Sequence, residues 1–136
     1  MKTIGIVGSR RRDSNADLKL TRKAFDAIYE KGDRIVSGHC PQGGDKFAEI
    51  IAKELGLTEE NGKLILHRPK WNEFGKRAGF VRNTYIAEDA DILIAVASAD
   101  RKGGTEDTIN KATLLDKKII IVPEPHLNEF DPLEDM

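Results

Sequence analysis

The segment Thr3-Ile4-Gly5-Ile6-Val7-Gly8-Ser9 joins a short apolar run to a glycine turn. Four further runs have the same character, because they are rich in Ile and Val and do not alternate with polar residues. Short apolar runs without alternation are typical of strands that are covered on both faces. We therefore predict five buried strands, at residues 3–7, 34–37, 63–67, 91–97 and 118–122.

Helical spacing separates the predicted strands. Leu18, Thr21, Phe25 and Ile28 repeat at intervals of three and four residues, and Gly32 stands where that helix would stop. Similar spacing predicts helices around residues 47–57, 81–86 and 105–112, and leaves 68–77 as the longest loop. The alternation predicts an α/β fold with a single doubly wound, five-stranded parallel sheet and helices on both faces. We expect the first strand to be central and the fourth to lie beside it.

Composition bounds the class of protein. The chain has 136 residues, a formal charge of −1 and one cysteine, which excludes an internal disulfide framework and a Cys-rich zinc site. No run approaches the ~20 apolar residues of a membrane span, and the N-terminus leads directly into a strand without a signal peptide. We therefore predict a cytoplasmic protein with one domain, residues 1–123, and an acidic C-terminal tail, residues 124–136.

The charge is distributed unevenly along the chain. All 22 Lys and Arg residues precede residue 124 and five of the 23 acidic residues follow it, so the body has a net charge of +4. This charge suits a small anionic ligand, but polynucleotide binding is disfavoured because no basic stripe is visible. His39, His67 and His126 lack spaced partners, so we predict no metal site and no cofactor. A homo-oligomer is compatible with these features.

Glycine-rich loops follow three of the predicted strands. They are Gly8-Ser9-Arg10, the segment from Gly38 to Asp45, and Arg101-Lys102-Gly103-Gly104-Thr105. The carboxyl ends of parallel strands lie at one edge of a sheet, where ligands bind in such folds. Two of these loops lead into helices, whose free N–H groups favour an anion. The three loops together predict a ligand that carries phosphate.

Two known phosphate motifs do not fit these loops. Gly5 and Gly8 do not form the dinucleotide fingerprint G-x-G-x-x-G. Gly38 and Gly43 have the spacing of a P-loop, but Gly44-Asp45 replaces the required Lys-Ser/Thr pair. Asp45 has two possible roles. It can be only the N-cap of the following helix, or it can be the N-cap and also accept a hydrogen bond from a sugar hydroxyl.

Several other residues have both a structural and a functional interpretation. Arg82 can bind phosphate through two hydrogen bonds or lie on the surface. Arg10 is the better candidate for an anion in its arginine triplet, and Arg11 and Arg12 are predicted to be surface residues. For His39-Cys40 we favour an ordinary loop cysteine over a nucleophile. For Trp71 we favour a core anchor over a base-stacking platform.

The motifs together resemble a known family. Ile6-Val7-Gly8-Ser9-Arg10, Val36-Ser37-Gly38 with Gly43-Gly44-Asp45, Ala78-Gly79-x-x-Arg82-Asn83 and Gly103-Gly104-Thr105-x-x-Thr108 occur in the expected order. Over residues 4–122 the chain resembles the SLOG superfamily, in particular its small stand-alone branch related to YspA and the YpsA-like proteins. More distantly it is similar to the LOG phosphoribohydrolases and to DprA. The resemblance implies a Rossmann-like sheet that binds nucleotides or nucleotide-derived ligands.

The resemblance implies a ligand site at the three loops and at the helix before the fourth strand. Its ligand would be a nucleoside phosphate or an ADP-ribose-like molecule, and Arg82 matches the arginine that LOG enzymes carry in that helix. The candidate ligand-binding residues are Gly8, Ser9, Arg10, Gly38, Gly43, Gly44, Asp45, Arg82, Asn83, Gly103, Gly104, Thr105 and Thr108.

One position departs from the pattern of the LOG enzymes. Where they carry a catalytic Glu, this chain has Thr108. A threonine hydroxyl cannot act as a general base at neutral pH, and it has no negative charge to stabilise an oxocarbenium-like centre. We therefore expect a sensor or binding module and assign no catalytic residue. Two alternatives stay open. One is a LOG-like N-glycosidase that uses Asp45 or Glu106, and the other is a DprA-like DNA-associated protein.

Overall fold

The computed structural model describes residues 1–125. His126 and all but two residues of the predicted acidic segment 124–136 lie outside the described residues. No helix within residues 1–125 is both long and apolar enough to cross a membrane.

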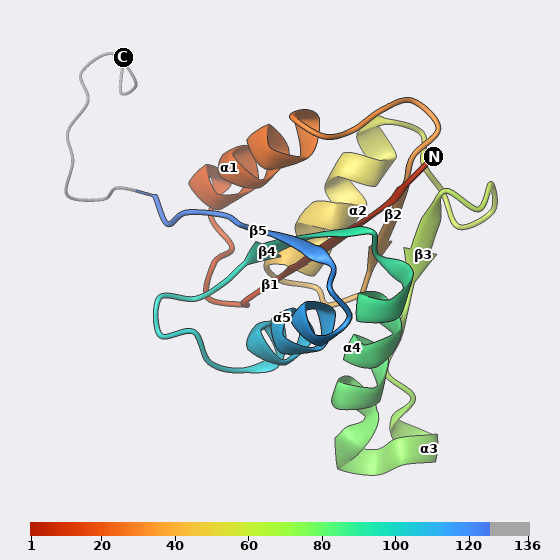
Figure 1. Cartoon of the computed structure of the whole chain (residues 1–136), viewed down its shortest axis with the longest axis vertical. Helices are drawn as coiled ribbons and strands as arrows, with labels where there is room; N and C mark the ends of the chain where they lie inside the picture. Colours follow the sequence, from red (N-terminus) through yellow and green to blue (C-terminus); the bar gives the residue numbers. More distant parts are fainter. Residues whose placement is uncertain (126–136) are drawn as a thin grey trace.

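One five-stranded sheet forms the centre of the fold, and all of its pairings are parallel (Figure 1). The strand order is β3-β2-β1-β4-β5, so the central first strand and the adjacent fourth strand are confirmed. Ile4 of β1 pairs with Ile35 of β2 on one side and with Ile92 of β4 on the other. The strands are β1 (Thr3–Gly8), β2 (Arg34–Ser37), β3 (Leu64–Leu66), β4 (Ile92–Val96) and β5 (Lys118–Ile121).

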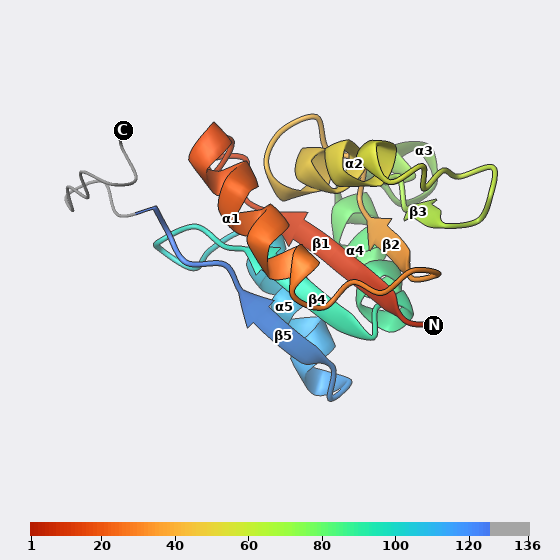
Figure 2. The same cartoon turned by 90° about the horizontal axis from the view of Figure 1, so that it is seen from above.

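Helices cover both faces of the sheet, as predicted for a doubly wound fold (Figure 2). On one face, α1 (Asn15–Asp26) and α2 (Gly44–Glu54) pack on alternate strand residues such as Ile6 and Ile94. On the other face, α4 (Ala78–Asp89) and α5 (Gly104–Leu114) pack on Val7 and Leu93. Successive strand residues point to opposite faces, so this two-sided burial explains why the strands lack polar alternation.

The segment 68–77 differs from the prediction of a loop. It contains a single-turn helix, α3 (Trp71–Phe74), followed by a 3-10 turn, η1 (Gly75–Arg77), that leads into α4. The prediction that Trp71 anchors the core is also wrong, because its side chain is 58% exposed. Figure 1 gives the physical reason, since α3 lies beyond the end of the sheet, where no sheet face can cover the indole.

Candidate functional site

The first turn of α2 packs directly on the carboxyl end of β1. A Cβ on Gly44 would lie 2.3 Å from the carbonyl carbon of Val7, and one on Gly43 would lie 2.3 Å from the carbonyl oxygen of Ser9. Gly43 also has a φ of 76°, which disfavours other residues. Close packing alone therefore accounts for glycine at 43 and 44. Its effect is to bring the start of α2 to the loop that follows β1.

The helices at this edge begin differently from α1. At α1, Ser14 and Asp17 form a complete capping box. At α2 and α5 the N-cap residues are Gly43 and Gly103, and neither helix has a side-chain cap. The first turns of α2 and α5 therefore present backbone N–H groups and positive helix ends that suit an anion.

Asp45 lies in the first turn of α2 and is not its N-cap, so that structural interpretation is corrected: the N-cap is Gly43. The reason is that the helix begins two residues earlier than an N-cap at Asp45 would require. The Asp45 carboxylate instead accepts hydrogen bonds from the Ser37 hydroxyl at 3.2 Å and from the Cys40 backbone N–H at 3.2 Å. Burial of this side chain raises the pKa of Asp45 to about 6, although the Arg82 charge acts in the opposite direction.

Arg82 extends from α4 to the loop that follows β2. A Cβ on Gly38 would lie 2.8 Å from Arg82 Nη1 and 2.9 Å from Asp45 Oδ2, so glycine here lets both charged groups approach the strand end. Arg82 Nε donates to the Asn83 side-chain oxygen at 2.9 Å. Within residues 1–125, its two terminal nitrogens have no hydrogen-bond or ion-pair partner. The guanidinium therefore has donors free for an anionic ligand.

Two of the predicted polar residues donate hydrogen bonds to the first turn of α5. Asn83 Nδ2 donates to the carbonyl oxygen of Gly104 at 3.2 Å and to Asp107 at 3.1 Å. The Thr108 hydroxyl donates to the same carbonyl at 3.2 Å and is almost fully buried. Asn83 therefore holds the first turn of α5 against α4, whereas the Thr108 hydrogen bond lies within α5 itself.

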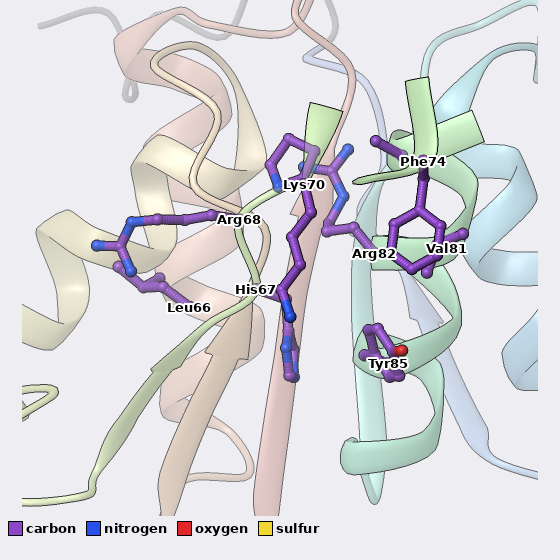
Figure 3. A pocket seen from close by; sticks show the side chains of 10 residues that line it. Leu66, His67, Arg68, Lys70, Phe74, Val81, Arg82 and Tyr85 are labelled. Carbon is purple, nitrogen blue, oxygen red and sulfur yellow. The ribbon is translucent and has the colours of Figure 1, made fainter. Parts of the chain in front are cut away.

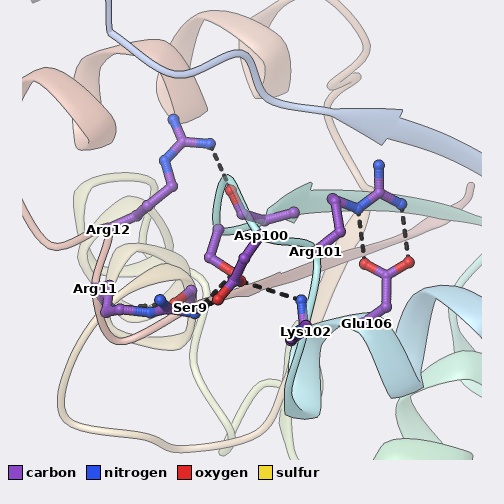
Figure 4. Close-up of polar contacts among 9 residues, drawn as sticks. Ser9, Arg11, Arg12, Asp100, Arg101, Lys102 and Glu106 are labelled. Atoms are coloured by element: carbon purple, nitrogen blue, oxygen red, sulfur yellow. Dashed lines mark hydrogen bonds and ion pairs between the residues drawn. The ribbon is translucent and has the colours of Figure 1, made fainter.

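The loops after β1 and β4 are joined by ion pairs and hydrogen bonds (Figure 4). Arg11 donates to Asp100 at 2.8 Å and to the Ser98 hydroxyl at 3.1 Å. Arg101 forms two hydrogen bonds with Glu106, at 2.7 and 3.0 Å. Glu106, one of the two carboxylates considered for catalysis, is therefore already paired with a cation.

Arg12 is buried, which corrects the prediction that it lies on the surface. Its guanidinium donates to Asp17 at 2.9 Å and to three backbone carbonyl groups, of Ala97, Val122 and Pro123, at 3.1, 2.7 and 2.6 Å. These carbonyl groups lie at strand ends, where the sheet ladder provides no donor. Arg10, by contrast, is exposed. Only its backbone lies near the start of α2, close to the position that a Cβ on Gly43 would occupy.

Asp13 is a functional candidate that the sequence analysis missed. Its carboxylate accepts the Gly43 N–H at 2.9 Å and pairs with Lys46 at 2.6 Å, and these bonds lower its pKa. His39 contacts Glu49 at 3.2 Å. In the part of the chain that the structure describes, no three His, Cys, Asp or Glu side chains gather as a metal site would require.

A pocket of about 450 Å³ lies next to this edge of the sheet and was also missed (Figure 3). One wall is the segment that follows β3, with His67 and Lys70, and the other is α4, with Val81, Arg82 and Tyr85. Arg82 thus contributes to the pocket as well as to the contact with Gly38. The sequence signal that could have indicated the pocket is the cluster of cations in residues 67–82.

The fold is similar to two solved structures. The X-ray structure of DNA processing protein A (DprA) from Streptococcus pneumoniae matches with a TM-score of 0.70 and 24% identity, over 93% of this chain and 52% of that chain. The X-ray structure of TM1055, a structural-genomics target, matches with a TM-score of 0.56 and 20% identity, over 88% of this chain and 72% of that one. The chain spans about half the length of the DprA structure. The likeness to DprA that the sequence predicts is therefore confirmed for the fold.

Comparison of the sequence with protein-family models and with curated proteins finds no match.

Proposed function

We propose that this protein is a SLOG-type module that binds a nucleotide or a nucleotide-derived ligand at the carboxyl edge of its sheet. The observation that carries the proposal is the Arg82 guanidinium. It lies against Gly38 at the end of β2, and within residues 1–125 its terminal nitrogens have no partner. A phosphate group would accept hydrogen bonds from both nitrogens.

The surroundings of Arg82 support the same proposal. The strand order reverses between β1 and β4, and doubly wound sheets bind ligands at such a switch point. The N-termini of α2 and α5 lie at this edge and have no side-chain cap. The Asp45 carboxylate approaches the same glycine as Arg82 and is an acceptor for a ribose hydroxyl.

A thermal-shift screen with nucleoside mono- and diphosphates and dinucleotides tests the proposal. A ligand present at about 100 times its Kd stabilises the folded state by about 2.7 kcal/mol, which raises the melting temperature. No upward shift with any of these compounds would contradict the proposal.

We expect Arg82→Ala to weaken the binding of the best compound by about 1.5–3 kcal/mol, because a charge-assisted bond to phosphate is lost. Isothermal titration calorimetry measures the change. Arg77→Ala is the matched control, since Arg77 is exposed in η1 and lines neither the pocket nor the contact with Gly38. Equal affinities for the Arg82→Ala variant and the unmodified protein would show that Arg82 does not bind the ligand.

One observation favours a second candidate, an N-glycosidase. Asp45 is a buried carboxyl group with a pKa raised to about 6, and such a group can act as a general acid near neutral pH. Chromatography of AMP, GMP, CMP and UMP incubated with the protein separates the two candidates. The binding module is expected to release no free base. Release at ordinary enzymatic rates that is lost in Asp45→Asn would favour the enzyme.

A further inference from the structure

The pocket between α4 and the segment that follows β3 lies outside the three glycine loops and has its own chemistry. It is lined by apolar groups and rings, including Leu66, Phe74, Val81 and Tyr85. Three cations, Arg68, Lys70 and Arg82, lie among them. Its volume of about 450 Å³ falls within the range of small-molecule sites, roughly 300–1,000 Å³. An occupant would therefore have a flat or apolar part and an anionic part.

The net positive charge of the body lies in the stretch of sequence that supplies most of the pocket lining. Residues 67–82 contain five Lys or Arg and one acidic residue, a net charge of +4. The body, residues 1–123, also has a net charge of +4, so the remainder of the body is balanced. The excess positive charge is therefore confined to one segment. Such a local charge favours binding of a small anion at this pocket over binding of an extended anion along the surface.

Only some of these cations are paired. Arg68 forms two hydrogen bonds with Glu59, at 2.8 and 3.1 Å, so its charge is already compensated. Among the described residues, Lys70 has no ion-pair or side-chain hydrogen-bond partner, and the terminal nitrogens of Arg82 have none. Within residues 1–125, Lys70 therefore has no direct partner and Arg82 has only the nearby charge of Asp45, so both cations can bind a multiply charged anion at this pocket.

Ring-bearing side chains lie on the same walls. His67 from the β3 side and Tyr85 from α4 have ring centroids 5.6 Å apart, and His67 also contacts Asp89. Phe74 and Val81 complete this apolar part of the pocket in Figure 3. Aromatic and apolar side chains of this kind bind a planar heterocycle by stacking and burial.

Arg82 connects the pocket to the glycine loops, because it lines the pocket and also lies against Gly38. We propose that the pocket binds the aromatic ring of a nucleotide, and that Lys70 and Arg82 bind a two-phosphate chain that leads from the ring toward the loops. The ligand is then a nucleoside diphosphate or an ester of one. This proposal rests on the proposed function and specifies its ligand.

Calorimetry with ribose 5-phosphate, AMP and ADP as probes tests the proposal, because these compounds add first a ring and then a second phosphate. With the unmodified protein we expect ADP to bind at least about tenfold more tightly than AMP. Lys70→Ala is expected to remove most of this preference and to leave the Kd of AMP within about twofold. Lys76→Ala removes the same charge from an exposed residue that does not line the pocket, and is expected to change neither Kd.

A second variant tests the position of the ring. Val81→Trp fills the pocket, so we expect it to weaken AMP and ADP at least about tenfold and to leave ribose 5-phosphate within about twofold. Circular dichroism checks that this variant is folded, and if it is not, the exposed Lys70→Ala variant still decides the outcome.

The outcomes separate this inference from the proposed function. Equal affinity for AMP and ADP, an equal effect of Lys70→Ala and Lys76→Ala, or unchanged AMP binding in folded Val81→Trp would each overturn the inference alone. Failure of all three probes to bind would also overturn the inference, whereas the proposed function is overturned only if no compound of the thermal-shift screen binds.

Discussion

The Asp45 carboxylate is held by opposing effects. The Ser37 hydroxyl and the Cys40 N–H favour its charged form, whereas burial favours the protonated form and prevails. Its pKa of about 6 in the folded protein lies above that of an unfolded aspartate, about 3.9. Between these values the folded protein binds a proton that the unfolded chain does not. The stability from this group is therefore fully present below pH ~4 and is lost as the pH rises through about 6.

Asp45→Asn tests this pH dependence. Between pH 4 and pH 7 the free energy of unfolding of the variant should rise relative to that of the unmodified protein by up to about 3 kcal/mol, the equivalent of a pKa shift of about two units. Urea unfolding at four pH values measures the difference. Carboxylates with lowered pKa values, such as Asp13 and Asp33, are present in both proteins, so their contributions cancel in the difference in free energy of unfolding. A difference that does not vary with pH, like that expected for the exposed Asp26→Asn, would contradict this account.

Sequence patterns predict single residues unevenly. Arg82 could be recognised because its motif resembles one in a known family, and the structure places it at the expected edge beside Gly38. The burial of Arg12 was not predictable, because three consecutive arginines are typical of a solvated loop. Its acceptors belong to residues 97, 122 and 123, which are distant in the sequence and come together only in the folded chain.

At the scale of elements, the position of α2 depends on glycine at its start. The first turn of the helix lies so close to β1 that a single methyl group would overlap the backbone of Val7. The start of α5 is less crowded, since a Cβ on Gly104 would meet only Asn83, at 3.9 Å. The two glycine-led helices therefore share a sequence signature but differ in why glycine is needed.

We expect Gly44→Ala to lower the free energy of unfolding by about 1–3 kcal/mol, because a crowded contact must open. Gly104→Ala is the matched control and should be neutral or stabilising by up to about 1 kcal/mol, since the unfolded chain loses conformational freedom. Thermal unfolding of both variants measures the contrast. Similar melting temperatures would mean that α2 can shift to accommodate the methyl group.

The long elements were predictable and the short one was not. The three central strands are buried on both faces and the edge strands β3 and β5 are partly exposed, but the apolar runs mark all five to within one residue. Helix α3 is a single turn, which is too short to show a helical repeat. Because α3 and η1 lie between β3 and α4, the sequence indicates the pocket beside them only through the cations of residues 67–82 and does not give its shape.

At the scale of the whole molecule, Arg12 joins parts of the chain that no single element connects. It links the loop after β1 to Asp17 of α1, to the end of β4 and to the residues that follow β5. One buried cation therefore joins segments at the carboxyl ends of β1, β4 and β5, at the same edge of the sheet as the candidate site. The total charge of −1 therefore indicates neither this buried cation nor the net charge of +4 in residues 67–82.

Arg12→Ala is expected to lower the free energy of unfolding by roughly 3–5 kcal/mol, because Asp17 would be left buried without its partner. Arg11→Ala is the control, since the ion pair of Arg11 with Asp100 is exposed and exposed pairs contribute about 0–1 kcal/mol. Urea denaturation gives both values. Equal losses of free energy of unfolding in the two variants would mean that burial does not increase the contribution of Arg12 to stability.

The exposed position of Trp71 has a consequence for spectroscopy. It is the only tryptophan of the chain and follows Lys70 directly. An indole that is already 58% exposed changes its surroundings little when the chain unfolds, so its emission wavelength is a poor reporter of denaturation. The same fluorophore adjoins Lys70, one of the residues that line the pocket between α4 and the segment after β3. Its intensity can therefore follow the arrival of a heterocycle without an attached dye, while ellipticity follows the fold.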